Sequence, residues 1–175
     1  MSGGRGAVAP AAAWWIKCDP TSAAHGGWDW PDLFREYRRG ARYLWSVGTP
    51  LSQKNARAAA QGDPVLGYSA GDGHRTLTAL AEVVEGGVLV PGTPPPSRNS
   101  PLPGGFTVAL RPVALLENPV PLEDLRVALR RHEPQFLRTR FGSIFRVSGP
   151  ELRALLREAR RHNPRLRVPP AWSRR

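Results

Sequence analysis

The residues of this sequence that are best suited to binding chemistry stand close together, at Trp45, Ser46 and Asn55. They supply an aromatic ring, a small hydroxyl and a side-chain amide, just ahead of Gly62-Asp63, which opens an apolar stretch. A pocket that reads a flat polar ring needs an aromatic face for stacking and a few polar atoms that fix the edge of the ring. The set is therefore a candidate for a pocket that reads a flat polar ring, provided that the flanking chain builds a fold that shapes one.

Catalytic chemistry has little support in the sequence. The four histidines are scattered, and none stands at metal-ligand spacing from another histidine or from the single cysteine, Cys18. The chain lacks the fingerprints of serine hydrolases, phosphate-binding loops and dinucleotide-binding folds. We therefore expect a protein that is not an enzyme and that uses neither a metal nor a cofactor. An accessory role in nucleic-acid modification or restriction is the remaining catalytic alternative.

The chain is strongly basic, with a net charge of +11 and a pI near 11.4. Clustered arginines attract phosphates, so this charge indicates a polyanionic partner. Lys17 and Lys54 are the only lysines among the 25 basic residues, and such an arginine bias is equally what genomic base composition produces. Both interpretations stay open. The excess is greatest from Arg153 to Arg175, where eight arginines face one acid, Glu158.

The single cysteine also bears on the compartment. Cys18 cannot form an internal disulfide, which indicates a reducing environment that we expect to be the cytoplasm. No apolar run approaches the roughly 20 residues of a membrane span, so no membrane contact is expected. Residues 1–12 are rich in Gly and Ala and too weakly apolar for a signal peptide, and we expect a disordered leader there.

Residues 13–162 have the length and patterning of a single domain. Strands are predicted where apolar, aromatic or β-branched residues alternate, at 13–18, 65–69, 76–84 and 106–113, with a helix left open for 76–84. Helices are predicted at 31–39, 54–61, 121–131 and after a capping box formed by Ser148 and Glu151. The segment 136–147 is predicted to be irregular or extended. This order of elements indicates an α+β protein built around a small sheet or barrel.

Two segments are expected to lie outside the core. Residues 86–105 hold six Pro and five Gly in 20 residues, and we expect a linker or a long hairpin loop. Residues 163–175 are expected to form a disordered basic Pro/Arg tail.

Within the first strand, alternation sends Trp15 to one face and Trp14 and Ile16 to the other.

From Trp14 to about Arg161, the order of motifs resembles the EVE family, a PUA-like fold related to the YTH domains. The matching pieces are Trp14-Trp15-Ile16, Trp45-Ser46-Val47 followed by Asn55, Gly62 to Tyr68, Ala79 to Val83, Arg111 to Val113 ahead of Pro119 to Leu122, and Phe141 to Arg146. The resemblance implies a PUA-like pseudo-barrel of mixed, mainly antiparallel strands flanked by helices.

The resemblance also implies a function. Such domains are understood to flip a modified base, for example a methylated or hydroxymethylated one, into an aromatic-lined pocket beside a basic surface. Stacking and edge hydrogen bonds offset the cost of extrusion. Carried over, Trp45 is the cage tryptophan, Trp15 a second wall or a core residue, and Tyr68 a wall or a core residue. The other implied base-binding residues are Ser46, Asn55, Phe141 and Ser143, with loop capping as the alternative for Asn55. The residues implied for nucleic-acid backbone contacts are Lys17, Lys54, Arg57, Arg138, Arg140, Arg153 and Arg157.

Two functional hypotheses follow. In the first, the protein is a non-catalytic reader of modified DNA or RNA that acts beside a nuclease or modification enzyme encoded separately. In the second, it is a small-ligand or protein-interaction module whose pocket takes a free nucleoside-like metabolite.

Overall fold

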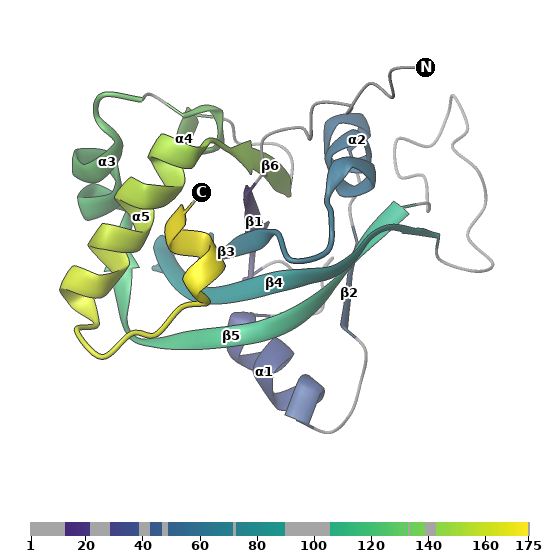
Figure 1. Ribbon diagram of the computed structural model, residues 1–175, viewed down its shortest axis with the longest axis horizontal. Helices are drawn as coiled ribbons and strands as arrows, with labels where there is room; N and C mark the ends of the chain where they lie inside the picture. Colours follow the sequence, from purple (N-terminus) through teal and green to yellow (C-terminus); the bar gives the residue numbers. More distant parts are fainter. Residues whose placement is uncertain are drawn as a thin grey trace, which may run out of the picture.

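The computed structural model describes residues 13–21, 29–38, 43–46, 49–71, 73–89, 106–132, 134–138 and 143–174 (Figure 1). For residues 43–46, 50, 89 and 174 it describes the backbone only. In this part of the chain, a single curved sheet carries helices on both of its faces (Figure 1).

The strands of the sheet are β1 (Ala13–Cys18), β2 (Tyr43–Ser46), β3 (Pro64–Ser69), β4 (Thr76–Leu89), β5 (Phe106–Pro121) and β6 (Ile144–Val147). Their order across the sheet is β2-β5-β4-β3-β1-β6. β1 runs parallel to β3, and the other neighbours are antiparallel. The mixed, mainly antiparallel sheet confirms the predicted fold class.

The helices are α1 (Trp30–Arg38), α2 (Pro50–Ala58), α3 (Leu122–Leu129), α4 (Gln135–Arg138), α5 (Gly149–His162) and a 3₁₀ helix, η2 (Pro170–Arg174). α2 begins four residues before the predicted start at Lys54. The segment 136–147, predicted to be irregular or extended, contains the end of α4 and the strand β6. β4 continues to Leu89, so the predicted loop at 86–105 is wrong for its first four residues.

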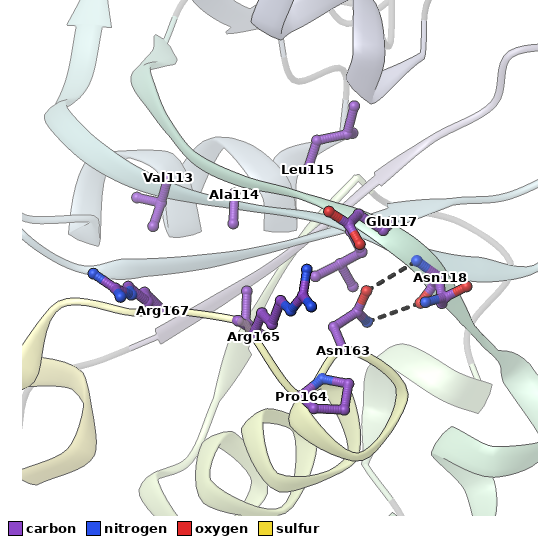
Figure 2. Close-up of a pocket in the computed structure, with 11 residues that line it drawn as sticks. Val113, Ala114, Leu115, Glu117, Asn118, Asn163, Pro164, Arg165 and Arg167 are labelled. Atoms are coloured by element: carbon purple, nitrogen blue, oxygen red, sulfur yellow. Dashed lines mark hydrogen bonds between the residues drawn. The ribbon is translucent and has the colours of Figure 1, made fainter.

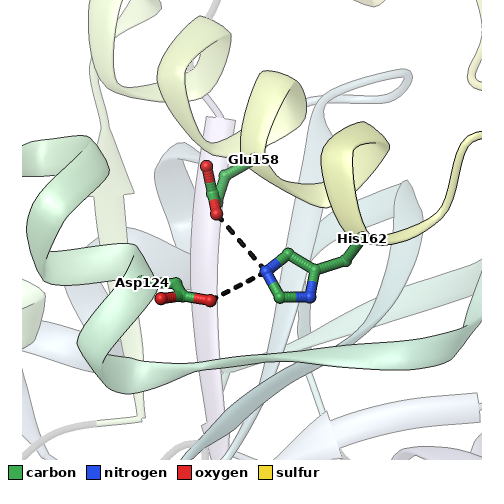
Figure 3. A group of neighbouring side chains, drawn as sticks. All are labelled: Asp124, Glu158 and His162. Carbon is green, nitrogen blue, oxygen red and sulfur yellow. Dashed lines mark hydrogen bonds and ion pairs between the residues drawn. The ribbon is translucent and has the colours of Figure 1, made fainter.

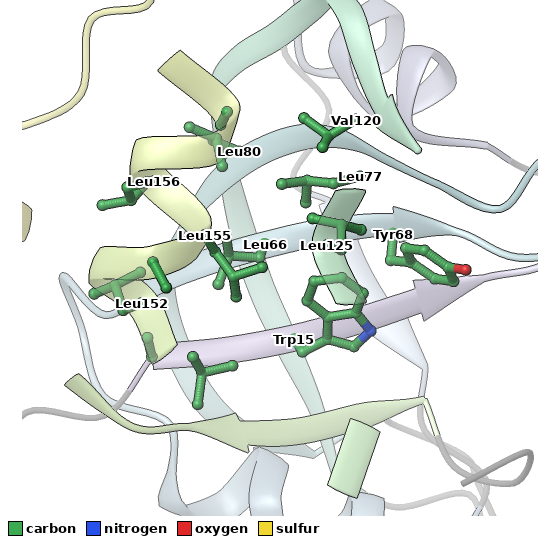
Figure 4. Close-up of a cluster of buried hydrophobic side chains, with 14 of the residues drawn as sticks. Trp15, Leu66, Tyr68, Leu77, Leu80, Val120, Leu125, Leu152, Leu155 and Leu156 are labelled. Atoms are coloured by element: carbon green, nitrogen blue, oxygen red, sulfur yellow. The ribbon is translucent and has the colours of Figure 1, made fainter. Parts of the chain in front are cut away.

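Alternation along β1 builds two cores, one on each face of the sheet. Trp15 belongs to a cluster that packs beneath α3 and α5 (Figure 4), whereas Trp14 and Ile16 belong to a second cluster together with Trp30 and Leu33 of α1. All five side chains are at most 1% exposed. The predicted split of the two tryptophans is therefore confirmed.

The predicted turn at Gly62-Asp63 is also present, and it has a physical cause. Gly62 has a φ of +84°, a backbone conformation that residues other than glycine rarely adopt. The buried carboxylate of Asp63 then accepts hydrogen bonds from Trp14 Nε1 and Ala60 N, each at 2.9 Å. The turn thereby ties the end of α2 to β1 and β3.

The last helix starts with the predicted capping box. Ser148 Oγ accepts from Glu151 N at 3.5 Å, and Glu151 Oε2 accepts from Ser148 N at 2.7 Å. Its buried face packs on the sheet through Leu152, Leu155, Leu156 and Ala159. The prediction that residues from 163 onward are disordered is wrong, because Trp172 is 1% exposed within the same core cluster. Its large apolar ring holds this segment against the domain.

Candidate nucleic-acid interface

Helix α2 begins with a complete local start signal. Thr49 is its N-cap, and Thr49 Oγ1 accepts a hydrogen bond from Ser52 N at 3.2 Å. Pro50 occupies the first turn, where backbone N–H groups have no intrahelical partner, so its missing N–H costs no hydrogen bond. The helix turns Ser52 inward, with 0% of its surface exposed. A buried hydroxyl needs hydrogen-bond partners, and Ser52 finds them on a strand that is distant in sequence.

Ser52 Oγ is an acceptor for the start of β6. Ser143 N donates to it at 3.0 Å and Ile144 N at 3.4 Å. Thr49 Oγ1 donates to the same oxygen at 2.9 Å. One side chain of α2 therefore satisfies two backbone donors that lie some 90 residues further along the chain.

Asn55, on the next turn of α2, contacts the same strand. Its Nδ2 donates to Ile144 O at 2.9 Å. Residues three apart on a helix share a face, so Ser52 and Asn55 together hold the N–H and the C=O of Ile144. At the end of β1, Lys17 N donates to Ser143 O at 2.8 Å. We refer to Ser52, Asn55, Ser143 and Ile144 as the α2–β6 junction.

The junction also orients the amide of Asn55. The amino group must face Ile144 O, because two oxygens cannot share a hydrogen bond. Oδ1 is then directed away from β6, and no residue in the described part of the chain donates to it. The side chain is half-buried. Asn55 therefore presents one acceptor in a fixed direction.

The other side of α2 reaches the start of β5. Gln53 Oε1 accepts from Phe106 N at 2.9 Å, and the Arg57 guanidinium lies 4.8 Å from the centre of the Phe106 ring. α2 therefore connects β6, at one edge of the sheet, with the strand next to the other edge. That other edge is β2, where Trp45 pairs with Val108 and Ser46 with Thr107, beside Phe106. The strand that carries the predicted cage tryptophan thus directly precedes, in the order of elements, the helix that forms the junction.

Lys17 is the cation nearest to the junction along β1. Its side chain is half-buried, with Nζ 4.9 Å from the centre of the Phe145 ring. Burial lowers the pKa of Lys17, because the charged ammonium loses hydration there. An approaching phosphate would compensate that lost hydration, which suits the predicted contact with a nucleic-acid backbone.

Two residues predicted to line the base pocket lie in the main core instead. Trp15 is 0% exposed, with its ring centre 4.5 Å from that of Phe136 and 4.9 Å from that of Tyr68. Figure 4 shows Trp15 and Tyr68 side by side within this cluster. Tyr68 is 5% exposed. A ring without accessible surface cannot stack on a base unless the core opens. We therefore assign Trp15 and Tyr68 to packing, which is the alternative already weighed for both residues.

The remaining predicted residues divide between two regions. Lys54 and Arg57 are exposed on α2, beside the junction. Arg138 is exposed at the end of α4, and Arg153 and Arg157 are exposed on α5. The predicted residues that lie outside the described chain are Arg140 and Phe141, together with the side chains of Trp45 and Ser46.

Sequence reasoning missed Ser52 and Ile144 of the junction, and also Gln53, which contacts β5 from the same helix. Thr49-Pro50 is a recognisable helix start, and it would have placed Ser52 and Asn55 on one face of the helix. Nothing local indicates that this face meets β6.

The single cysteine sits in a separate buried polar group. Cys18 Sγ donates to Asp29 Oδ1 at 3.3 Å, and Ser69 Oγ donates to the same oxygen at 2.5 Å. Burial, together with the Asp29 carboxylate, raises the pKa of the Cys18 thiol far above its ordinary value. The thiol is therefore not poised to act as a nucleophile.

Two carboxylates and a histidine meet between α3 and α5 (Figure 3). His162 Nε2 lies 2.8 Å from Asp124 Oδ2 and 3.4 Å from Glu158 Oε1. Arg161 pairs with the same two carboxylates, at 3.3 Å and 2.5 Å. Because Arg161 pairs with both carboxylates, the group serves as an ion-pair network that links the two helices.

Known proteins with similar sequence patterns or structures share this fold. The sequence profile of the EVE domain matches residues 12–158. A hypothetical protein from Leishmania major is 20% identical, with a TM-score of 0.67 over 87% of this chain and 96% of that one. Human THYN1 in complex with 5-methylcytosine-containing DNA is 17% identical, with a TM-score of 0.67 over 85% and 97%. Protein Atu2648 from Agrobacterium tumefaciens is 21% identical, with a TM-score of 0.63 over 91% and 97%.

At these identities the structural likeness shows a shared fold, and it confirms the predicted PUA-like architecture. No curated protein is similar enough in sequence to count as a relative. Within the described residues, no helix combines the length and the apolar character that crossing a membrane requires. The profile match extends over most of the sequence, and this chain belongs to the EVE domain family.

Proposed function

We propose that this protein binds DNA that carries a modified base and reads the base beside the α2–β6 junction. The supporting observation from the chain itself is the orientation of Asn55. Its amino group is held by Ile144 O, so Oδ1 remains as an acceptor. The exocyclic amine of cytosine is a donor that such an oxygen suits. The human THYN1 structure, which contains 5-methylcytosine DNA, supports the choice of DNA and of this base.

The remaining roles are assigned by position. Trp45 stacks on the flipped base, since it lies at the end of β2, just before the helix that carries Asn55. Ser46 and Ser143 supply edge contacts, and Phe141 forms part of the rim. A methyl group on the base adds about 0.8 kcal/mol of apolar burial, which corresponds to roughly a fourfold gain in affinity. Stacking and edge bonds together offset the cost of unpairing.

The phosphates are bound by basic residues in two places. Lys17, Lys54 and Arg57 lie at or beside the junction, where they contact the strand whose base is flipped. The other proposed contacts are Arg138, Arg140, Arg153 and Arg157. Each phosphate neutralised releases condensed counterions, so the affinity falls linearly with salt on logarithmic axes.

In this proposal, the protein is a binding module that catalyses no reaction of its own. Its consequence in the cell then depends on a partner, such as a nuclease or a modification enzyme encoded separately. The free thiol of Cys18 suits a reducing compartment such as the cytoplasm.

Matched oligonucleotides test the proposal. Labelled duplexes that differ in one base, as cytosine, 5-methylcytosine or 5-hydroxymethylcytosine, are titrated over a salt series, with single-stranded RNA of the same sequence in parallel. We expect tighter binding to at least one modified duplex and a negative salt slope. Equal affinity for all duplexes, or no salt dependence, would refute the reader function.

Variants separate the pocket from general binding. Trp45→Ala and Asn55→Ala are expected to remove the preference for the modified base while leaving the salt slope in place. Tyr37→Ala is the matched control, because Tyr37 is an exposed aromatic side chain on α1. Binding of free 5-methylcytidine without any gain from the oligonucleotide would instead favour the small-ligand module.

A further inference from the structure

We propose that the free edge of β5 and the C-terminal segment facing it form a docking groove for an extended acidic segment of a partner protein. The groove has a volume of about 460 Å³ and is lined by β5 from Val113 to Asn118 and by residues 163–167 (Figure 2). It shares no residue with the α2–β6 junction. The inference therefore does not rest on the proposed DNA binding.

One wall of the groove is a strand with an unpaired edge. β2 pairs with β5 only from Thr107 to Leu110. From Arg111 onward, β4 is the single strand partner of β5 among the described strands. Alternate peptide groups of such an edge point away from their neighbour and are open to another strand. Addition of an extended peptide to a sheet edge is an established mode of recognition.

The opposite wall is held firmly in place. Asn163 Nδ2 donates to Asn118 O at 2.9 Å, and Asn118 N donates to Asn163 Oδ1 at 2.9 Å (Figure 2). Leu166 and Val168 pack against the main core, and Trp172 anchors the end of the segment. The two asparagines close one end of the groove. The cavity is thus a built feature rather than a gap beside a loose tail.

The charge of the groove indicates an acidic occupant. Arg165 and Arg167 are exposed, alternate with the two core residues, and line the groove (Figure 2). Neither forms an ion pair with any residue of the described chain, in contrast to Arg111, which pairs with Glu82. Glu117 is the single acid in the lining. Guanidinium groups bind carboxylates through paired hydrogen bonds, so a segment with spaced Asp or Glu fits.

We assign the occupant to another protein, because no stretch of the sequence outside the described residues has the composition of an acidic strand. The stretches of this chain outside the described residues contain only two acids, Asp72 and Glu133, which stand alone at separate places. None of these stretches could therefore supply a strand with spaced acidic residues. The open peptide groups of β5 also favour a peptide over a nucleic acid, because a phosphodiester chain lacks the alternating N–H and C=O groups that pair with a strand edge.

Labelled peptides of about eight residues, long enough to run past residues 111–118, test the proposal by fluorescence anisotropy. The first alternates Glu with Val, the second replaces Glu by Lys, and the third keeps the acids but carries Pro at alternate positions. The variant Arg165→Glu with Arg167→Glu is compared with the control Arg126→Glu with Arg130→Glu. The control changes the net charge equally at two exposed positions, one on α3 and one at its C-cap. Arg165→Gln with Arg167→Gln is a milder second variant, and thermal unfolding checks that each is folded.

We expect the acidic peptide to bind, with at least about a tenfold loss in the Arg165 and Arg167 variants and less than about a threefold loss in the control. Hydrogen exchange is expected to slow at backbone amides between Arg111 and Glu117 when this peptide is bound, since the amide of Asn118 is already bonded to Asn163. Equal binding of the lysine or proline peptide, an equal loss in the control, or no binding at all would overturn the proposal. Protection of the same residues by a single-stranded oligonucleotide but not by the peptide would make the groove a nucleic-acid surface instead.

Discussion

Replacing Ser52 with alanine perturbs the α2–β6 junction at its centre. The Ser52 hydroxyl has no exposed surface and accepts hydrogen bonds from Ser143 N at 3.0 Å and Ile144 N at 3.4 Å. Thr49 Oγ1 donates to it as well, at 2.9 Å. Alanine fits the same space but accepts no hydrogen bond. Two backbone N–H groups and the hydroxyls of Thr49 and Ser143 therefore lose a partner, although the backbone of α2 is unchanged.

The expected cost follows from these contacts. A buried donor left without an acceptor costs about 1–3 kcal/mol. The bond from Ile144 N is long and counts for less, and Ser143 is half-buried, so water replaces part of its loss. We expect the free energy of unfolding to fall by about 2–3 kcal/mol, out of the roughly 5–15 kcal/mol of a typical domain. At about 2–4 °C per kcal/mol for a chain of this length, Tm falls by about 4–12 °C.

Ser143→Ala is the matched control, because the Ser143 hydroxyl has a single contact in the junction, at 3.4 Å to Ser52 Oγ. Its loss should cost less than about 1 kcal/mol. Thermal and urea unfolding followed by circular dichroism measure both variants, and hydrogen exchange reports on the Ile144 amide. If Ser52→Ala and Ser143→Ala have the same Tm, or if exchange at Ile144 is unchanged in Ser52→Ala, the junction does not hold β6 in the way inferred here.

Three further predictions concern other parts of the fold. The Cys18 thiol, which is buried beside Asp29 with a raised pKa, is expected to react with a disulfide reagent only after unfolding; labelling at the same rate in the native protein would contradict this. Gly67→Ala is expected to cost about 1–3 kcal/mol in urea unfolding, since an added Cβ would lie 2.5 Å from the Trp30 ring, and an unchanged midpoint would show that the ring moves freely. Burial lowers the pKa of Lys17 in the folded state below its ordinary value of 10.5. As the pH rises from this lowered pKa toward 10.5, the buried ammonium loses its proton more readily in the folded state, which stabilises the wild type but has no counterpart in Lys17→Met. The Tm of the variant minus that of the wild type should therefore fall with rising pH in this window, and a constant difference would refute the shift.

Local patterns in the sequence were sufficient for much of the fold. Alternation in the first strand placed Trp14 and Trp15 on opposite faces, and the structure puts them in two different cores. The Ser148–Glu151 box marked the start of α5, because a helix cap is a contact between residues three apart. A resemblance carried by ordered motifs indicated the PUA-like fold, which the family match and the solved structures confirm.

Side-chain roles that depend on distant contacts were decided only by the tertiary structure. Trp15 reads equally as a pocket wall or as core in the sequence, and its stacking on Phe136, from a helix near the other end of the chain, makes it core. The segment after residue 162 has the composition of a tail, yet Trp172 buries its ring in the main cluster. Composition describes how a segment behaves alone, whereas burial depends on the surface that another segment offers.

The base pocket shows the same division. The sequence alone brought Trp45, Ser46 and Asn55 together, because they are near neighbours along the chain. It could not show that Ser52 and Asn55 hold the N–H and the C=O of Ile144, roughly 90 residues away. No local pattern encodes which strand a helix face will meet, since that choice is made by the pairing of the whole sheet and by the packing of its two cores. The tertiary structure therefore determined the orientation of the Asn55 amide, on which the proposed reading of a base depends.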